Sequence, residues 1–486
     1  MQNLNRRTTN KPKTLPIKVL QFGGGNFLRG FVDWMIQVLN DKTDFNGGVL
    51  IVKPTERGDY QILKSQEGLF TVVLDGIKSG ALIAKKSLVA SVQEIVNPYS
   101  EWDVYLELAK NPEIRFIVSN TTEAGIKFNR ADSFSDNPPQ EFPAKLTLWL
   151  YKRFQHFGND ISKGCILLPC ELIEDNGATL KSVILEYAEH WNLDPDFVNW
   201  IYTANHFCST LVDRIVSGYP KDRADTIEAE LGYKDKLLVA GEYYHSWIIK
   251  GPAIVQKELP FANTDLNVAF VQDLAPYREM KVKILNGAHT AMVPVGYLAG
   301  LRLVKEAMND DVVSKFIESL LMKETIATLD FPEEELHKFV QDVLDRFRNP
   351  LLKHQLISIS LNSTSKFVAR LLPTLTDYFV SKGSLPKRIV FGLSALIRFY
   401  KGAFNEQEIK LNDDVKVLSF FNLNWNKYDS KDMNMNVLIG IILSNTEIWG
   451  KDLTQFEGLV EAVGYNIISI ENIGVLETLK NIADDN

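Results

Sequence analysis

Three polar residues with acid–base and hydrogen-bonding chemistry lie in the segment Lys281–His289, which reads KVKILNGAH. A lysine such as Lys281 can donate or accept a proton if burial lowers its pKa from about 10.4 toward neutrality. Asn286 can donate an N–H to an oxygen that gains negative charge. His289 can hydrogen-bond a substrate hydroxyl or hold Lys281 in place. These residue types suit a site that moves a proton to or from a reacting oxygen.

Helical spacing can place the three side chains on one side of the chain. At about 100° per residue, Lys281, His289 and Asn286 project at about 0°, 80° and 140°. One helix can therefore direct all three toward one cleft. The alternative is three polar residues on a half-exposed helix, and the segment alone does not exclude it.

A glycine turn near the start of the chain predicts a nucleotide site. Ile17–Phe22 has the composition of a strand, Gly23–Gly25 follows at once, and a helical pattern opens at Asn26. Such a turn lets the backbone approach a pyrophosphate, and the helix N-terminus supplies free N–H groups. The match to G-x-G-x-x-G is incomplete because Leu28 stands in place of the third glycine, and a simple tight turn remains possible. The expected cofactor-binding residues here are Phe22, Gly23, Gly24, Gly25, Asn26, Phe27 and Arg29, with an ordinary surface charge as the alternative for Arg29.

The choice between NAD and NADP stays open from the residues alone. The next strand, Gly48–Val52, is followed by Lys53-Pro54-Thr55-Glu56-Arg57. An acidic residue at this place holds the ribose in NAD-binding folds, and Glu56 is displaced from it by a few residues. Lys53 and Arg57 would instead favour a 2′-phosphate.

Polar loops follow two further strands, where ligands of open α/β sheets bind. Arg115–Val118 leads into Ser119–Gly125, in which Asn120 and Glu123 are cofactor candidates, although a capped loop is equally consistent. Cys165–Leu168 leads into a loop in which Asn176 is a candidate N–H donor to substrate, although Asn before Gly is often structural. Further strands are expected at Leu69–Leu74 and Ser87–Val96, and a strand pair at Leu238–Ile249 with Glu242, His245 and Trp247 as pocket or core residues.

Past about Asp273 the pattern becomes helical. An amphipathic helix is expected around Val313–Leu321, capped by Asn309 or Asp310, and others at Glu334–Phe347, Phe367–Val380, Lys387–Tyr400 and Val437–Leu443. The sequence therefore predicts an α/β Rossmann-type nucleotide-binding domain at 1–272, followed by a mostly α-helical domain at 273–486. Lys281 falls just past this boundary, and pockets are frequent at domain interfaces.

Bulk composition excludes several classes of protein. At 486 residues with 45% hydrophobic residues and a net charge of −8, the chain is globular, and nucleic acid is not expected as its main partner. No apolar run approaches the roughly 20 residues that span a bilayer, so no membrane partner is expected. Cys165, Cys170 and Cys208 lack metal-ligand spacing and a disulfide pattern. A basic N-terminal stretch without an apolar region and the few cysteines favour a cytoplasmic protein; the oligomeric state, monomer or dimer, stays open.

Four motifs in order resemble one family. They are the GGGNFLRGF turn, the Asp213-Arg214-Ile215 run, Lys281-x4-Asn286-x2-His289, and Arg346–Pro350 (RFRNP). Together they resemble the polyol-specific long-chain dehydrogenases, the mannitol dehydrogenase family, over nearly the whole chain. From the residues alone, an ion pair within the chain is the default for Asp213 and Arg214.

The resemblance implies an NAD-linked, metal-independent interconversion of a keto-sugar or sugar acid with its alcohol. Lys281 would be the acid/base, Asn286 would steady the oxyanion, and His289 would bind a hydroxyl and position Lys281. Lys366 would contact the small-molecule sugar-acid substrate. Asn176 and Asp213 are further candidates for substrate binding, and the sequence does not choose between Lys366 and Arg29 as the cation for the substrate carboxylate.

Mannitol-type members of the family carry Arg and Asn at the positions of Ser358 and Leu172. These two differences count against mannitol as the substrate. The segments VKPTERG, SNTTEAG and LPCELIEDNG favour a sugar-acid branch. The alternatives are fructuronate or a sugar alcohol as substrate, a nucleotide sensor without turnover, and a metal-dependent enzyme.

Overall fold

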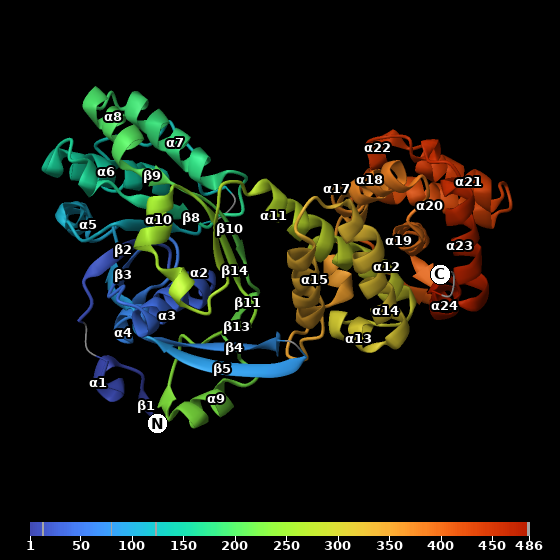
Figure 1. Ribbon diagram of the computed structural model, residues 1–486, viewed down its shortest axis with the longest axis horizontal. Coiled ribbons are helices and arrows are strands. Elements are labelled where there is room, and N and C mark those ends of the chain that lie inside the picture. The colour runs from blue at the N-terminus through green and yellow to red at the C-terminus, as the bar shows by residue number, and fades with distance from the viewer. Residues whose placement is uncertain (12–13, 79, 122–123, 484–486) are drawn as a thin grey trace. The chain divides into compact units, whose positions relative to one another are not determined.

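The computed structural model describes residues 1–11, 14–78, 80–121 and 124–483. The chain divides into two compact units, which we treat separately (Figure 1). The first unit contains residues 1–75 and 83–274, and the second contains residues 76–82 and 275–486.

The first unit is built on a six-stranded sheet with the order β6-β3-β2-β7-β8-β9, in which every neighbouring pair is parallel. Numbered by their order along the chain, these strands stand 3-2-1-4-5-6, which is the Rossmann arrangement. This order confirms the predicted fold class of the first domain. The strands are β2 (Ile17–Phe22), β3 (Gly48–Val52), β6 (Val92–Val96), β7 (Phe116–Ser119), β8 (Ile166–Pro169) and β9 (His206–Phe207).

Apolar side chains on both faces of this sheet bury its strands. Successive side chains of a strand point to opposite faces, so β2 and β3 supply Leu20, Phe22, Leu50 and Val52 to one core and Val19, Val49 and Ile51 to another. The helical segments of this unit are α2 (Asn26–Leu28), the π-helical turn η1 (Arg29–Asp33), α3 (Trp34–Lys42), α4 (Gln61–Ser65), α5 (Trp102–Glu107), α6 (Phe142–Phe157), α7 (Asn176–His190), α8 (Pro195–Ala204), α9 (Ala224–Leu231) and α10 (Ala253–Glu258).

Two smaller sheets complete the strands of the first half. One has the order β11-β13-β4-β5 and the other β10-β14-β15. The strand pair expected at Leu238–Ile249 is therefore wrong in one respect, because β13 and β14 belong to different sheets; Trp247 is buried in the core. The bounds are β4 (Phe70–Lys78), β5 (Ala81–Val89), β10 (Ser209–Asp213), β11 (Val216–Gly218), β13 (Val239–Glu242), β14 (Ser246–Lys250) and β15 (Val268–Val271), with β1 (Gln2–Asn3) pairing with β12 (Tyr233–Lys234).

The second unit is helical around one large apolar core, as the sequence predicts. Asp310 caps its helix by accepting hydrogen bonds from the N–H groups of Val312 and Val313. The single helix expected at Phe367–Val380 is two helices, because the chain breaks between Arg370 and Leu372, just before Pro373. The helical segments are α11 (Ala275–Met280), the π-helical turn η5 (Lys281–Asn286), α12 (Gly287–Leu298), α13 (Val304–Asn309), α14 (Asp311–Ser319), α15 (Glu333–Phe347), α16 (Leu356–Ile359), α17 (Ser363–Arg370), α18 (Leu372–Lys382), α19 (Lys387–Phe399), α20 (Val415–Asp429), α21 (Met435–Leu443), α22 (Thr446–Trp449), α23 (Leu459–Ile473) and α24 (Val475–Ala483).

Helix α19 runs through the middle of this core, and all but its first two residues are buried. Among the described residues, no helix has the length and apolar character needed to cross a membrane.

Candidate active site

The predicted catalytic residues occupy a π-helical turn and the first turn of the helix after it. Lys281 and Asn286 are the ends of η5, and His289 lies in α12 (Figure 1). The regular α-helix assumed from the sequence is therefore wrong across this segment. A π-helix closes its hydrogen bonds from residue i to residue i+5. Because each turn takes up more residues than in an α-helix, Lys281 and Asn286 project in more similar directions than the 140° separation expected.

The two lysines of this turn have different surroundings. Lys283 is buried, and its Nζ lies 2.8 Å from Glu279 Oε1 and 2.9 Å from Asp377 Oδ2. These two carboxylates raise the pKa of Lys283 against the opposing effect of burial. Lys283 is therefore held as a charged anchor between α11 and α18. Lys281 is half-buried at the start of the turn.

Asn286 and His289 present polar atoms that the protein does not use. Among the described residues, the side-chain amide of Asn286 forms no hydrogen bond, and Nε2 of His289 is buried without a partner. Burial lowers the pKa of His289 well below its ordinary value, and nearby His354, Arg346, Arg370 and Lys366 lower it further. His289 is therefore a neutral imidazole, which can accept a hydrogen bond from a hydroxyl at one ring nitrogen.

The cations near His289 make this part of the second unit electropositive. Lys366 donates from Nζ to the carbonyl of Ile359 at 2.7 Å. Arg370, one turn later in α17, donates from Nη1 to Thr290 Oγ1 at 3.3 Å. Of these residues, Lys366 is predicted from the sequence, whereas Arg370 and His354 are not. The i, i+4 spacing of Lys366 and Arg370, which puts both on one helix face, is a signal that could have revealed Arg370.

The glycine turn of the first unit has the backbone that its composition predicts. Gly23 has a φ of +115°, and a Cβ there would lie 3.2 Å from Leu28 Cδ1. Gly25 is the N-cap residue of the short helix α2 and is exposed, and a Cβ there would have no atom within 4 Å. The first N–H groups of a helix have no partner within it, so this turn presents donors beside open space. Asn26 is also exposed, and the ring of Phe27 stacks on that of Phe31 at 5.0 Å.

Gly23 and Asn120 come together where the strand order reverses. Strands β2 and β7 are neighbours, and the N–H of Asn120 donates to the carbonyl of Phe22 at 3.5 Å. A Cβ on Gly23 would lie 3.5 Å from the carbonyl oxygen of Asn120. Dinucleotides bind at this switch point in doubly wound sheets. Glu123, the other candidate of this loop, lies outside the described residues.

Two cofactor candidates do not present their side chains to a ligand. Phe22 is fully buried, and its ring packs on Phe142 and Tyr105 at 5.2 and 6.3 Å. The ring of Phe22 therefore belongs to the core, and only the backbone of Phe22 remains a candidate for cofactor contact. Arg29 is also buried and donates to the carbonyls of Gly24 and Leu237 and to Asn26 Oδ1. It braces the glycine turn, so neither a phosphate contact nor a surface charge describes it.

Tyr60 is a contact of the glycine turn that the sequence patterns do not predict. The N–H of Gly24 donates to Tyr60 Oη at 2.9 Å. Lys53, Glu56 and Arg57 follow β3, and the latter two are exposed. No acidic residue directly follows β3, so these residues do not distinguish NAD from NADP as the cofactor.

Asn176 is wrong as a substrate ligand. It is fully buried, and its Nδ2 lies 3.0 to 3.1 Å from the carbonyl oxygens of Pro169, Glu171 and Thr210. Its Oδ1 accepts from the N–H of Thr210 at 2.8 Å. Every polar atom of this amide is used, so Asn176 ties β8 and β10 to the start of α7.

Arg214 and Asp213 do not form the expected ion pair. Arg214 is buried and donates to the carbonyls of Gly30, Tyr243 and Tyr244, with its guanidinium 4.3 Å from the Trp34 ring. Burial lowers the pKa of Arg214 to about 9. Neighbouring residues of a strand point to opposite faces, and Asp213 ends β10 half-buried.

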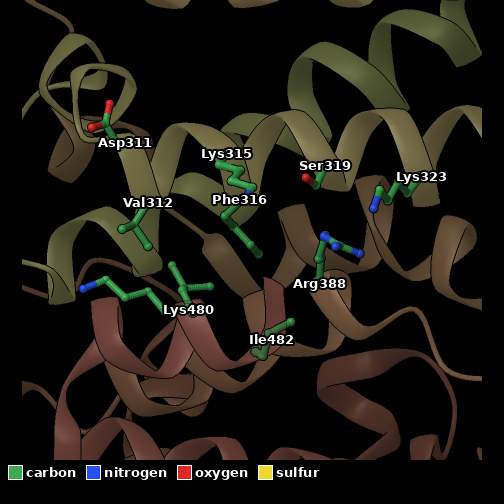
Figure 2. Close-up of a pocket in the computed structure, with 10 residues that line it drawn as sticks. Asp311, Val312, Lys315, Phe316, Ser319, Lys323, Arg388, Lys480 and Ile482 are labelled. Carbon is green, nitrogen blue, oxygen red and sulfur yellow. The ribbon is translucent and has the colours of Figure 1, made fainter. Parts of the chain in front are cut away.

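A separate pocket of about 430 Å³ lies in the second unit (Figure 2). Its walls come from α14, the π-helical turn η6 (Leu320–Thr325), α19 and α24. None of the candidate catalytic or substrate residues lines it. Within the described part of the chain, no cluster of three or more His, Cys, Asp or Glu side chains has the arrangement of a metal site.

Known proteins similar to this chain share both of its units. The curated relatives include altronate oxidoreductases of Yersinia enterocolitica, 46% identical over 98% of each chain, and of Escherichia coli, 45% identical over 99% of each chain. Among solved structures, a D-sorbitol dehydrogenase matches 98% of this chain and 100% of its own, with a TM-score of 0.77 at 19% identity. A mannitol 2-dehydrogenase of Pseudomonas fluorescens, solved with NAD and D-mannitol, matches with a TM-score of 0.64 at 20% identity and full coverage of both chains.

Family models match along nearly the whole chain. The mannitol dehydrogenase Rossmann domain matches residues 17–263, and the mannitol dehydrogenase C-terminal domain matches residues 273–471. The length of these matches and the sequence identity of 45 to 46% with the relatives confirm the resemblance to the mannitol dehydrogenase family. The chain belongs to the mannitol dehydrogenase family.

Proposed function

We propose that this chain is an NAD-linked oxidoreductase that interconverts D-altronate and D-tagaturonate. The observation that carries the proposal is the set of Lys281, Asn286 and His289 along η5 and the start of α12, where nearby cations lower the pKa of His289. A proton carrier and two hydrogen-bonding groups suit an alcohol–ketone interconversion, and positive charge suits a substrate that is an acid. The curated relatives named altronate oxidoreductase support the same substrate.

The glycine turn fits the cofactor. Gly25 leaves open space in front of the first helical N–H groups, and Gly23 takes a backbone conformation that a side chain would strain. Gly23, Gly25, Asn26 and Asn120 would hold the nucleotide at the switch point. Bound NAD would accept or supply the hydride. The mannitol 2-dehydrogenase of the same fold was solved with NAD, which supports this cofactor.

The proton is handled by the second unit. In the reductive direction the ketone carbon gains a hydride, and its oxygen becomes negative. The amide N–H of Asn286 would stabilise that oxygen. Protonated Lys281 would then transfer a proton from Nζ to the oxygen, which leaves the alcohol and a neutral lysine. Oxidation runs the same steps backward, and neutral Nζ takes the hydroxyl proton.

His289 would hold a substrate hydroxyl rather than transfer the proton. Its pKa lies well below the ordinary value, so the ring stays neutral at physiological pH. The buried Nε2 without a partner can accept a hydrogen bond from a hydroxyl of the sugar chain. This contact would fix the reacting carbon relative to Lys281.

A substrate panel tests the proposal. NADH formation is followed with altronate, and NADH loss with tagaturonate, fructuronate and fructose, with NADPH in parallel. We expect turnover with the altronate–tagaturonate pair and NADH to exceed every other combination by at least about tenfold, which corresponds to roughly 1.4 kcal/mol of discrimination. Faster turnover of fructuronate or of an uncharged sugar would replace the substrate assignment. Absence of turnover across the panel, with NADH still bound, would instead favour a nucleotide-binding sensor.

A further inference from the structure

Arg370 is a half-buried cation without a carboxylate partner. Its guanidinium makes a single hydrogen bond, from Nη1 to Thr290 Oγ1 at 3.3 Å, and no ion pair with any residue that the structure describes. Burial lowers the pKa of Arg370, and among the described residues no neighbouring carboxylate opposes the shift. A guanidinium carries five N–H donors, so most of its donors have no protein acceptor.

Other shielded arginines of this chain have acceptors within the protein. Backbone carbonyls accept from Arg29 and Arg214, and carboxylates lie beside three others. Arg398 lies 3.0 Å from Glu471, Arg388 lies 3.4 Å from Glu324, and Arg115 lies 2.8 Å from Glu258. Removing a charge from water without a partner is costly. These arginines have carboxylate or carbonyl acceptors, whereas Arg370 has one hydroxyl acceptor among the described residues. Its charge is therefore available to an anion from outside the chain.

The position of Arg370 ties it to the candidate catalytic segment. Thr290, which accepts the bond from Arg370, itself donates from Oγ1 to the carbonyl of Asn286 at 2.8 Å. A Cβ on Gly287 would lie 3.7 Å from the carbonyl oxygen of Arg370, so the end of α17 packs on the start of α12. Arg370 also contributes to the positive field that lowers the pKa of His289. An anion bound at Arg370 would therefore lie beside the residues that handle the reacting oxygen.

We propose that Arg370 binds the carboxylate of the sugar-acid substrate and thereby selects acids over uncharged sugars. The inference rests on the proposed function. A guanidinium presents paired N–H donors in the geometry of a carboxylate, and such charge-assisted pairs are strong and directional. The half-buried position strengthens the pairing because less water competes for the charges.

Lys366 is the less suitable residue for this role. Its Nζ already donates to the carbonyl of Ile359 at 2.7 Å, and Asp413 offsets part of its charge. It also presents a single point charge, whereas Arg370 can make two parallel hydrogen bonds. Lys366 would instead contact substrate hydroxyls or add to the positive charge around the substrate carboxylate.

The test compares substrates that differ only in charge. Wild type, Arg370→Leu, Arg370→Gln and Arg370→Lys are assayed with altronate and with its neutral amide, altronamide. We expect Arg370→Leu to raise the KM for altronate about 10- to 100-fold, the loss expected for a charged hydrogen bond, with a much smaller change in kcat. The preference of wild type for altronate over altronamide should largely disappear in Arg370→Leu and Arg370→Gln. Arg370→Lys should restore part of it, because the charge returns without the paired donors.

Lys315→Leu is the matched control, since Lys315 is a cation of the same unit that lines the separate pocket of Figure 2. It should leave the KM for altronate within about twofold of wild type, a change of less than roughly 0.5 kcal/mol. Added guanidinium ion should partly rescue Arg370→Ala with altronate and should not change its turnover of altronamide.

The outcomes separate the inference from the function on which it rests. A wild-type enzyme that does not turn over altronate defeats the proposed function. A wild-type enzyme that does, combined with an unchanged KM in Arg370→Leu, overturns the role of Arg370 alone. An equal loss of kcat for both substrates, with KM unchanged, also overturns it and shows that Arg370 acts by supporting Asn286 through Thr290. If Arg370→Leu does not fold, the charge preferences of the Gln and Lys variants decide between these outcomes.

Discussion

Lys281 and Asn286 are the first and last residues of one π-helical turn. The turn changes the relation that their spacing would have in an α-helix, because its hydrogen bonds span five residues. Short π-helical segments are uncommon and occur frequently at functional sites. Here the turn brings the proposed proton carrier and the proposed oxyanion donor toward a common direction.

Lys281→Ala should lower kcat about 10²- to 10⁴-fold, the range for loss of a positioned acid/base. Binding of NADH, measured by fluorescence titration, should stay unchanged because the nucleotide residues belong to the first unit. Lys283→Met, two residues away, is the control. It removes an anchor to Glu279 and Asp377 and should lower the melting temperature, with kcat within about threefold of wild type. Turnover of Lys281→Ala close to wild type would remove Lys281 from the mechanism.

Substitution of Asn286 should lower activity, whereas substitution of Asn176 should lower stability. Asn286→Ala removes an amide that the protein does not use, so we expect a loss of about 10²- to 10³-fold in kcat at nearly unchanged stability. Asn176→Ala removes a buried amide and leaves several backbone groups unpaired, at a cost of about 1–3 kcal/mol for each. Its melting temperature should fall, while the folded fraction keeps near-normal kcat. Thermal melts and active-site titration distinguish the two, and a catalytic loss in Asn176→Ala at normal stability would restore it as a substrate ligand.

Gly25→Asp should weaken NADH binding without unfolding the first unit. A Cβ at Gly25 meets no atom within 4 Å, so the side chain fits. Its carboxylate would stand where the pyrophosphate is expected and would repel it, and we expect the Kd for NADH to rise at least about tenfold. Gly25→Asn, which has nearly the same shape without the charge, is the control and should lose less. Equal affinity in both variants and wild type would place the pyrophosphate elsewhere.

Asp33 should make the stability of the first unit depend on pH. Burial raises its pKa to about 7, against the opposing influence of Gln21 and Arg29. Between its unfolded pKa near 4 and the folded value, the folded chain holds a proton that the unfolded chain has released. The free energy of unfolding therefore falls as pH rises through this window, by up to on the order of 4 kcal/mol. Above the folded pKa, Asp33 makes no further contribution to the pH dependence.

Asp33→Asn removes this dependence. The melting temperature of the variant should exceed that of wild type at pH 8 and approach it near pH 4 to 5. Melting curves measured across this range by circular dichroism give the comparison. Parallel pH profiles of the two proteins would show that Asp33 does not titrate in this window.

Much of the fold follows from local patterns in the sequence. The apolar run Ile17–Phe22, the three glycines after it and the helical pattern beyond are enough to predict a strand, a turn and a helix in a nucleotide-binding arrangement. The same holds for the helix that Asp310 caps, where the side chain and the first N–H groups are near in sequence. The spacing of Lys281, Asn286 and His289 likewise singled out the residues from which we argue the chemistry.

The tertiary structure decided what pairing and burial do to individual side chains. Asn176 and Asn286 have the same chemistry in the sequence. Within the described part of the chain, other segments supply hydrogen-bond partners to every polar atom of the Asn176 side chain and to none of the Asn286 side chain. Arg29 and Arg370 differ in the same way, since carbonyls from distant residues occupy one guanidinium and leave the other largely available. The sequence by itself determined the kind of chemistry and the two-part architecture. Contacts between residues far apart along the chain decide which polar groups form hydrogen bonds within the fold and which remain available to a ligand. No local sequence pattern encodes these contacts.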